Sequence, residues 1–174
     1  TEPVSYSFRN DPTATFQYVP IVQVLRNVLQ VQDVADEIIG ATPSISLNPD
    51  ILTGFRDGSL YREKLSTLVS NSSLDTIFLL LYTDEVEICN PLGAKRGTHK
   101  LCLVYFTILN LHPRYRSQLR LIHLVLTAKD ADLHRFGTSE VLQPLLCDLG
   151  LLKEEGVVVE REGQNVCVKA VVVA

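Results

Sequence analysis

The sequence predicts an α+β fold in which helices pack against a mixed sheet, and three observations lead to this expectation. The spacing of apolar residues changes along the chain, from every three or four residues before residue 70 to long apolar runs after residue 75. The first three of these runs follow one another after short connections, which favours antiparallel neighbours. With 174 residues, 46% of them hydrophobic, the chain can build one domain with a substantial core.

The first part of the chain is expected to hold an irregular arm and then a helical segment. Residues 1–18 are polar and are interrupted by Pro3 and Pro12, which predicts an arm without regular structure. A helical segment over 19–70 follows. It begins at Pro20, a favoured residue in the first turn of a helix, and its apolar residues recur at helical spacing.

Residues 75–174 are expected to form the sheet and its main helix. The run Ile77–Tyr82 is apolar on both faces of a strand, which predicts a position inside the sheet. A helix capped by Thr138 or Ser139 precedes a short hairpin and a very apolar last strand. The strands are expected, in chain order, at 76–88, 101–111, 119–128, 157–160 and 166–173.

Three antiparallel strands, a helix and a strand parallel to the first are the opening half of an RNase H-like fold. We therefore expect an RNase H-like mixed sheet preceded by the helical segment, with residues 75–174 as a partial domain of this class. Enzymes on this fold hold two divalent metal ions with carboxylates at neighbouring strand ends. The metals activate the water that cleaves a phosphodiester and stabilise the leaving oxygen.

A cluster of carboxylates stands at the end of the first strand, where Asp84, Glu85 and Glu87 follow the apolar run. Burying charged groups in such a strand is costly unless they are paired or coordinate a metal. Alternation along the strand places Asp84 on one face and the two glutamates on the other. Asp84 is therefore the candidate catalytic carboxylate and metal ligand, and the alternative is a strand that emerges into solvent at this point.

The stretch YTDEVEICNPLGAKRGTHKLCLVYFTILNLHPRYRSQLRLIHLVL carries a longer pattern around these acids. The strand with Asp84 is followed by Asn90–Gly93, a loop at Gly97–Lys100, an aromatic strand and a loop at Pro113–Ser117. As a set, these pieces resemble a block in transposon-derived proteins related to the CACTA-type (En/Spm) DNA transposases, which are expanded in fish and other animal genomes. The resemblance covers about residues 75–174.

The resemblance implies a DDE-type transposase core in which Asp84 matches the first catalytic carboxylate and Mg²⁺ or Mn²⁺ is the cofactor. It places the second carboxylate just past the strand over 168–173, so the chain to Ala174 is expected to be inactive. The first functional hypothesis is thus a domesticated module that binds nucleic acid or protein. The alternatives are metal-dependent DNA cleavage and strand transfer by the full-length protein, and a small interaction domain that dimerises through its C-terminal strand.

Basic residues are concentrated between Cys89 and Lys129, where seven Lys and Arg residues occur without any Asp or Glu. Such segregation of charge indicates an anionic partner, and the alternative is a set of solvated loops. The candidate contacts to nucleic-acid phosphates are Lys95, Arg96, His99, Lys100, Arg114 and Arg116. Tyr105 and Phe106 alternate faces within one strand, so at least one of them is buried and no base-stacking platform is predicted.

The cysteines and the apolar runs indicate the compartment. Cys89, Cys102, Cys147 and Cys167 are far apart and form no CxxC pair. We therefore expect no disulfide framework, no zinc site, and a reducing intracellular compartment, either nuclear or cytoplasmic. No apolar run approaches the roughly 20 residues of a membrane-spanning helix, so a membrane is not an expected partner.

Overall fold

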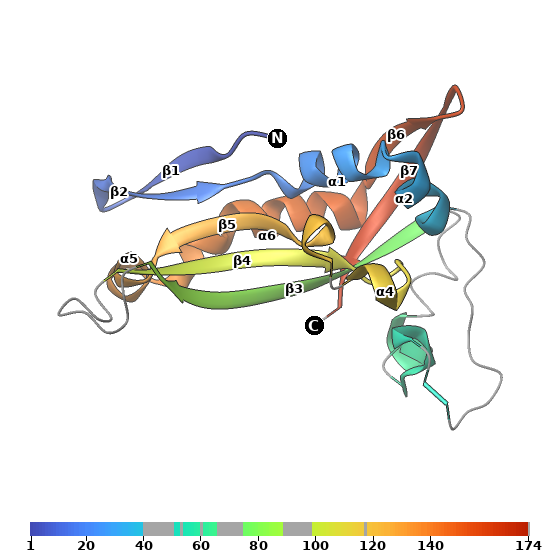
Figure 1. Ribbon diagram of the computed structural model, residues 1–174. Coiled ribbons are helices and arrows are strands. Elements are labelled where there is room, and N and C mark those ends of the chain that lie inside the picture. The colour runs from blue at the N-terminus through green and yellow to red at the C-terminus, as the bar shows by residue number, and fades with distance from the viewer. Residues whose placement is uncertain are drawn as a thin grey trace.

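A computed structural model of the chain describes residues 1–39, 51–52, 54–59, 61–65, 75–88, 99–116 and 118–173. Its strands form one mixed seven-stranded sheet in the order β1-β2-β5-β4-β3-β7-β6 (Figure 1). The strands are β1 (Val4–Phe8), β2 (Asp11–Tyr18), β3 (Asp75–Glu87), β4 (Lys100–Ile108), β5 (His123–Lys129), β6 (Val157–Arg161) and β7 (Gln164–Val172). The predicted α+β class is confirmed, and the sheet is wider than a set of three antiparallel strands.

The helices lie between these strands in the chain. The α-helices are α1 (Ile21–Leu29), α2 (Gln32–Ile38), α4 (Pro113–Arg116), α5 (Asp130–Phe136) and α6 (Thr138–Glu154). Further helical turns are η1 (Phe55–Asp57), η2 (Tyr61–Leu65) and η3 (Leu119–Leu121). The third long strand was predicted to begin at residue 119, but η3 occupies that position and β5 starts at His123. None of the described helices is long and apolar enough to cross a membrane.

The centre of the sheet is an antiparallel meander of β3, β4 and β5, as the short connections predicted. β7 pairs with β3 in parallel and with β6 in antiparallel orientation. β3 therefore lies between two strands, with β7 paired to Asp75–Leu79 and β4 paired to Leu79–Glu87, and Ile77, Phe78 and Leu79 are all buried. The predicted interior position of this apolar run is confirmed. The apolar C-terminal strand is likewise paired inside the sheet.

The predicted irregular arm over 1–18 is wrong, because this segment forms the hairpin of β1 and β2. In β2, the buried residues Ala14, Phe16 and Tyr18 alternate with more exposed ones, and the strand joins the sheet through β5. Pro12 is accommodated because the pairing between β1 and β2 is irregular beside it. The proline suggested a break in regular structure. The apolar residues that recur at every second position after it are typical of a strand.

The helices α1 and α6 contact each other, and Figure 1 shows α6 passing behind β5 with α1 above it. Within the predicted helical segment over 19–70, the described helices α1 and α2 pack against the sheet. Leu25 of α1 and Ile38 of α2 belong to the same buried cluster as Phe106 of β4 and Leu145 of α6. One core thus joins the N-terminal helices to the sheet. Part of the predicted helical segment over 19–70, including 40–50 and 66–70, falls outside the described residues.

The sheet has two unlike faces. The face beneath α1 and α6 carries the buried side chains of the main core. The opposite face, called the outer face below, is formed by Leu80, Tyr82, Asp84 and Val86 of β3 and by Leu101, Leu103, Tyr105 and Thr107 of β4. Among the described residues, Phe55 of η1 and Tyr61 of η2 cover one end of it by packing on Phe78. The middle remains accessible, because Tyr82 is 40% exposed and Val86 is 42% exposed.

Candidate functional site

Asp84 lies on the outer face of β3, opposite Leu103 of β4. Its side chain is exposed, and its Oδ1 accepts a hydrogen bond from the backbone N–H of Glu85 at 2.8 Å. All residues from Tyr82 to Val86 are exposed, so the strand emerges into solvent here, as the alternative interpretation of the acids predicted. The cost of burying a charge, which suggested a metal site, is therefore small at this position.

Glu85 and Glu87 lie on the opposite face of β3 from Asp84, as the alternation predicted. Lys100 of β4 forms an ion pair with Glu85, with Nζ and Oε2 3.2 Å apart. Burial raises the pKa of the neighbouring Cys102 thiol, and the negative charge of Glu85 raises it further. Within the described residues, no group of three or more His, Cys, Asp or Glu side chains converges to hold a metal ion. Asp84 is thus separated from Glu85 and Glu87, because they lie on opposite faces of β3.

The predicted phosphate contacts are divided between opposite ends of the sheet. His99 and Lys100 stand at the start of β4, while Arg114 and Arg116 follow its end in α4. The nine residues of β4 separate these groups by about 27 Å at the usual rise of a strand. The remaining candidates, Lys95 and Arg96, lie outside the described residues. The four described candidates therefore do not form one compact phosphate site.

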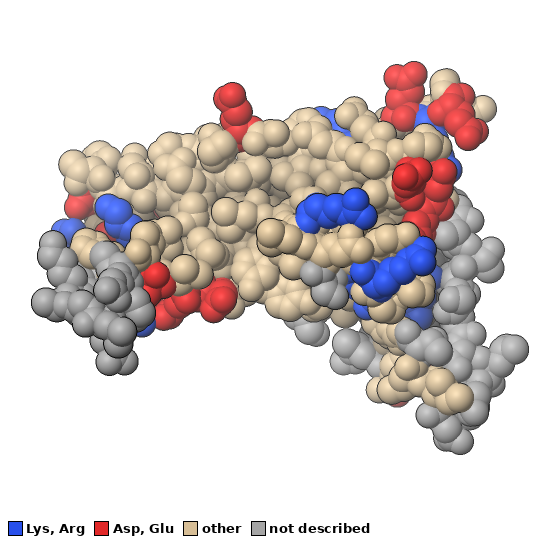
Figure 2. Space-filling model, viewed as in Figure 1, with Lys and Arg blue, Asp and Glu red and all other residues tan. Residues whose placement is uncertain are grey.

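Several basic side chains lie close together at the end of the sheet where α4 is found. Arg120 of η3 joins Arg114 and Arg116 there, and Figure 2 shows Lys and Arg gathered over α4 and the turn that follows it. Arg114 donates a hydrogen bond to the Tyr115 hydroxyl at 2.7 Å and lies over that ring, 4.5 Å from its centroid. This cation–π contact holds one guanidinium in place at the surface.

Arg116 is held more firmly than Arg114. Its Nε donates a hydrogen bond to the Leu111 carbonyl at 2.9 Å, and the Thr107 hydroxyl donates one to the carbonyl of Arg116 at 3.3 Å. Burial lowers the pKa of the Arg116 guanidinium, and the nearby Tyr82 hydroxyl opposes that shift. An arginine stays charged at neutral pH under such conditions. A fixed cation therefore stands beside the aromatic part of the outer face.

Two tyrosines form the aromatic part of the outer face. Tyr82 and Tyr105 are directly opposite each other on β3 and β4, and their rings stack with centroids 5.4 Å apart and an angle of 22° between the ring planes. They line a shallow pocket of about 510 Å³ whose further walls are Leu80, Thr107, Leu109, Pro113, Arg116 and Ile122. Phe106, by contrast, is fully buried, as expected for one of the two aromatic neighbours in β4.

The paired tyrosines are a feature that the sequence prediction missed. Alternation within β4 placed Tyr105 on one face, but it did not reveal which residue of β3 would stand opposite. The register of the antiparallel pair brings Tyr82 to that place. Aligning the two apolar strands as a hairpin is the signal that would have found the pair.

Comparison with known proteins adds no assignment to this geometry. No family model matches the chain, and no curated protein matches its sequence. The class of the protein therefore follows from the described fold alone, an α+β domain with a mixed seven-stranded sheet.

Proposed function

We propose that the chain is an RNase H-like module derived from a CACTA-type transposase, and that it binds single-stranded nucleic acid on the outer face of its sheet. The order of elements supports the fold part of this proposal: β3, β4 and β5 are antiparallel, α6 follows, and β7 is parallel to β3. The spacing of apolar residues in the sequence predicts the same order of strands and helix.

The observation that carries the binding proposal is the stacked tyrosine pair, in which Tyr82 is exposed and Tyr105 is half-buried, beside a fixed arginine. Aromatic rings on an accessible sheet face are suited to stacking against unpaired bases, and a nearby guanidinium is suited to a phosphate. Tyr82, Tyr105 and Arg116 line one shallow pocket, with Arg114 and Arg120 close to it in the chain. Asp84 stands two residues past Tyr82 on the same face. A nucleic-acid strand would therefore run from the tyrosines towards α4, away from this carboxylate.

Binding without cleavage agrees with the placement of the acids. Asp84 is exposed on the outer face, and the glutamates beside it point to the other face. Two-metal cleavage requires several carboxylates around the same ions. The described residues supply one acid at this place, so we propose a binding role for the described domain.

The test of the proposal is binding of a fluorescently labelled oligothymidylate, measured by anisotropy at low salt beside a duplex of the same length. Tyr82→Ala is expected to weaken binding by about 1–3 kcal/mol, or roughly 5- to 150-fold, the usual contribution of one stacked base. Tyr6→Ala is the matched control, because Tyr6 is 38% exposed, is also stacked on a neighbouring ring, and lies on β1 far along the sheet.

Two results would contradict the nucleic-acid proposal. One is equal binding by the Tyr82→Ala and Tyr6→Ala variants, and the other is no binding of either oligonucleotide at low salt. In the second case the exposed apolar residues of the outer face would favour a protein-interaction domain instead. Light scattering would then establish whether the partner is a second copy of the chain.

Metal-dependent DNA cleavage is a second candidate function, and the direction of β7 favours it. Val172 pairs with Leu79 in parallel, so β7 runs along β3 in the direction of Asp84. The resemblance implies that the second carboxylate follows this strand, and such an acid would approach Asp84. Mg²⁺- or Mn²⁺-dependent nicking of duplex DNA by the longest version of the protein, lost in Asp84→Ala, would support cleavage. Nicking that persists in Asp84→Ala would refute a role for this residue.

A further inference from the structure

A second cavity lies on the other side of β5 from the tyrosine pair, between α1, α2 and the segment from η3 into β5. Its volume is about 660 Å³. This is within the range of about 300–1,000 Å³ typical of small-molecule sites. Val24, Val28 and Val34 line it from the helices, and Leu111 and Leu121 line it from the opposite side. Aliphatic walls of this kind are suited to the hydrocarbon part of a ligand.

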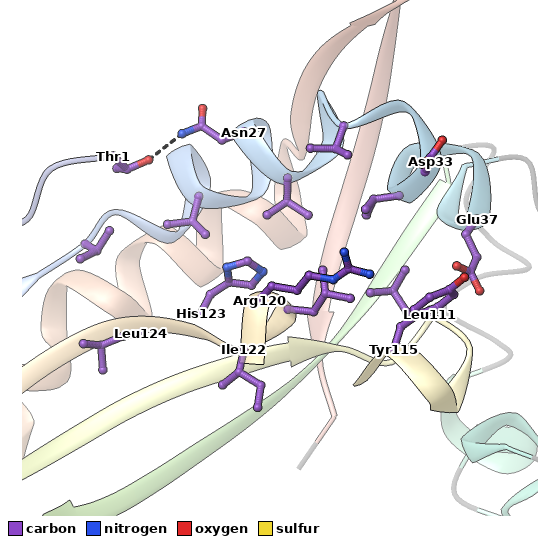
Figure 3. Close-up of a pocket in the computed structure, with 16 residues that line it drawn as sticks. Thr1, Asn27, Asp33, Glu37, Leu111, Tyr115, Arg120, Ile122, His123 and Leu124 are labelled. Atoms are coloured by element: carbon purple, nitrogen blue, oxygen red, sulfur yellow. Dashed lines mark hydrogen bonds between the residues drawn. The ribbon is translucent and has the colours of Figure 1, made fainter. Parts of the chain in front are cut away.

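Two polar side chains enter this groove from the same short segment. Figure 3 shows the His123 ring rising from the start of β5 towards α1, and the Arg120 side chain extending beside it towards α2. The Nε of Arg120 donates a hydrogen bond to the Gln118 side chain at 2.9 Å, which orients the guanidinium. These residues therefore place a cation and an imidazole next to the aliphatic walls.

His123 has an unused hydrogen-bonding atom. Its Nε2 is buried and has no hydrogen-bond partner among the described residues. The ring packs on Phe106, with centroids 5.1 Å apart, which restricts its orientation. Burial lowers the pKa of His123, so the ring is neutral at pH 7 and presents one donor and one acceptor nitrogen. A buried polar atom without a partner is uncommon, and a ligand atom would satisfy it after a small shift of the ring opens this nitrogen to the groove.

The acids of α2 limit the charge that the groove accepts. Glu37 is engaged, because its Oε1 accepts a hydrogen bond from the backbone N–H of His112 at 3.0 Å. Asp33 is exposed, and Figure 3 shows its carboxylate directed away from the groove. Two nearby carboxylates disfavour a multiply charged anion such as a phosphate, whereas Arg120 favours a single negative charge.

We propose that this groove binds a small amphipathic monocarboxylate. The hydrocarbon chain lies among the valines of α1 and α2, the carboxylate meets the Arg120 guanidinium, and His123 Nε2 forms a hydrogen bond with the ligand. The proposal is separate from nucleic-acid binding, since it rests on a different cavity and a different ligand, although Arg120 serves in both arguments.

The test is isothermal titration of the protein with octanoate and with octan-1-ol, its neutral counterpart. Arg120→Gln is expected to weaken octanoate binding about tenfold, the lower end of what a charged hydrogen bond contributes, and to leave octan-1-ol binding unchanged. Arg120 is exposed, so this substitution leaves the core intact. Arg9→Gln is the matched control, since Arg9 is an exposed arginine in the turn between β1 and β2, and it is expected to change neither ligand.

Amide NMR spectra recorded during the octanoate titration locate the site. Shifts centred on Val28 and His123 are expected, while Tyr82 and Val86 on the outer face stay unchanged. The proposal is overturned if octanoate gives neither heat nor shifts, or if the shifts centre on the outer face. Equal octanoate affinities of the Arg120→Gln and Arg9→Gln variants would overturn the role of the guanidinium.

Discussion

Gly156, between α6 and β6, is the position where a single methyl group is expected to disturb the sheet most directly. Its φ is +81°, a conformation that costs other residues about 1–2 kcal/mol. A Cβ there would stand 2.7 Å from the backbone oxygen of Val168 and 3.1 Å from the sulfur of Cys167. Val168 pairs with both β3 and β6, so it cannot move away without loss of strand pairing. We expect Gly156→Ala to reduce the free energy of unfolding by about 2–4 kcal/mol.

Urea denaturation followed by circular dichroism measures this effect, and Gly150→Ala within α6 is its control. A Cβ on Gly150 meets nothing within 4 Å. The substitution is expected to stabilise the protein by about 0.5–1 kcal/mol, because alanine favours a helix over glycine. The reasoning is refuted if Gly156→Ala lowers the free energy of unfolding by less than about 1 kcal/mol relative to Gly150→Ala.

Two further predictions concern buried polar groups. The Tyr18 hydroxyl donates to Asp148 at 2.7 Å and accepts from the Ile21 N–H at 3.2 Å, so Tyr18→Phe is expected to cost about 1–3 kcal/mol in a urea titration. A cost below that of Tyr115→Phe, whose hydroxyl is bonded at the surface, would contradict this. Burial holds the pKa of His123 below its unfolded value, so stability is lost as pH falls through about 6.5. His123→Gln is expected to flatten the decrease between pH 7.5 and 5.5, and an unchanged slope would contradict the assignment.

Local patterns predicted much of the fold. Apolar runs located β3 and β4 to within a few residues, and helical spacing after Thr138 located α6. These patterns are reliable because each depends on neighbours two to four positions away. The N-terminal hairpin was missed because Pro12 suggested a break, while its strands are stabilised by pairing that becomes visible only in the folded sheet.

The candidate site was less predictable than the fold. Asp84 was predicted to be a metal ligand from its place after the apolar run, and its exposure matches the alternative of a strand that meets solvent. The basic residues were grouped by their proximity in the sequence, but β4 carries His99 and Lys100 to the end of the sheet opposite Arg114 and Arg116. A strand separates residues that a turn would have brought together.

The central strands and the long helix, and the apolar side of each, follow from the amino-acid pattern, since these properties arise from the alternation of neighbouring side chains. The meeting of Tyr82 and Tyr105 on an accessible face, and the position of His123 beside a groove at α1, follow from the three-dimensional packing. Both arrangements depend on strand register and on contacts between segments that are distant in the chain. Such contacts depend on how all the core side chains pack together, and a local sequence pattern does not carry this information.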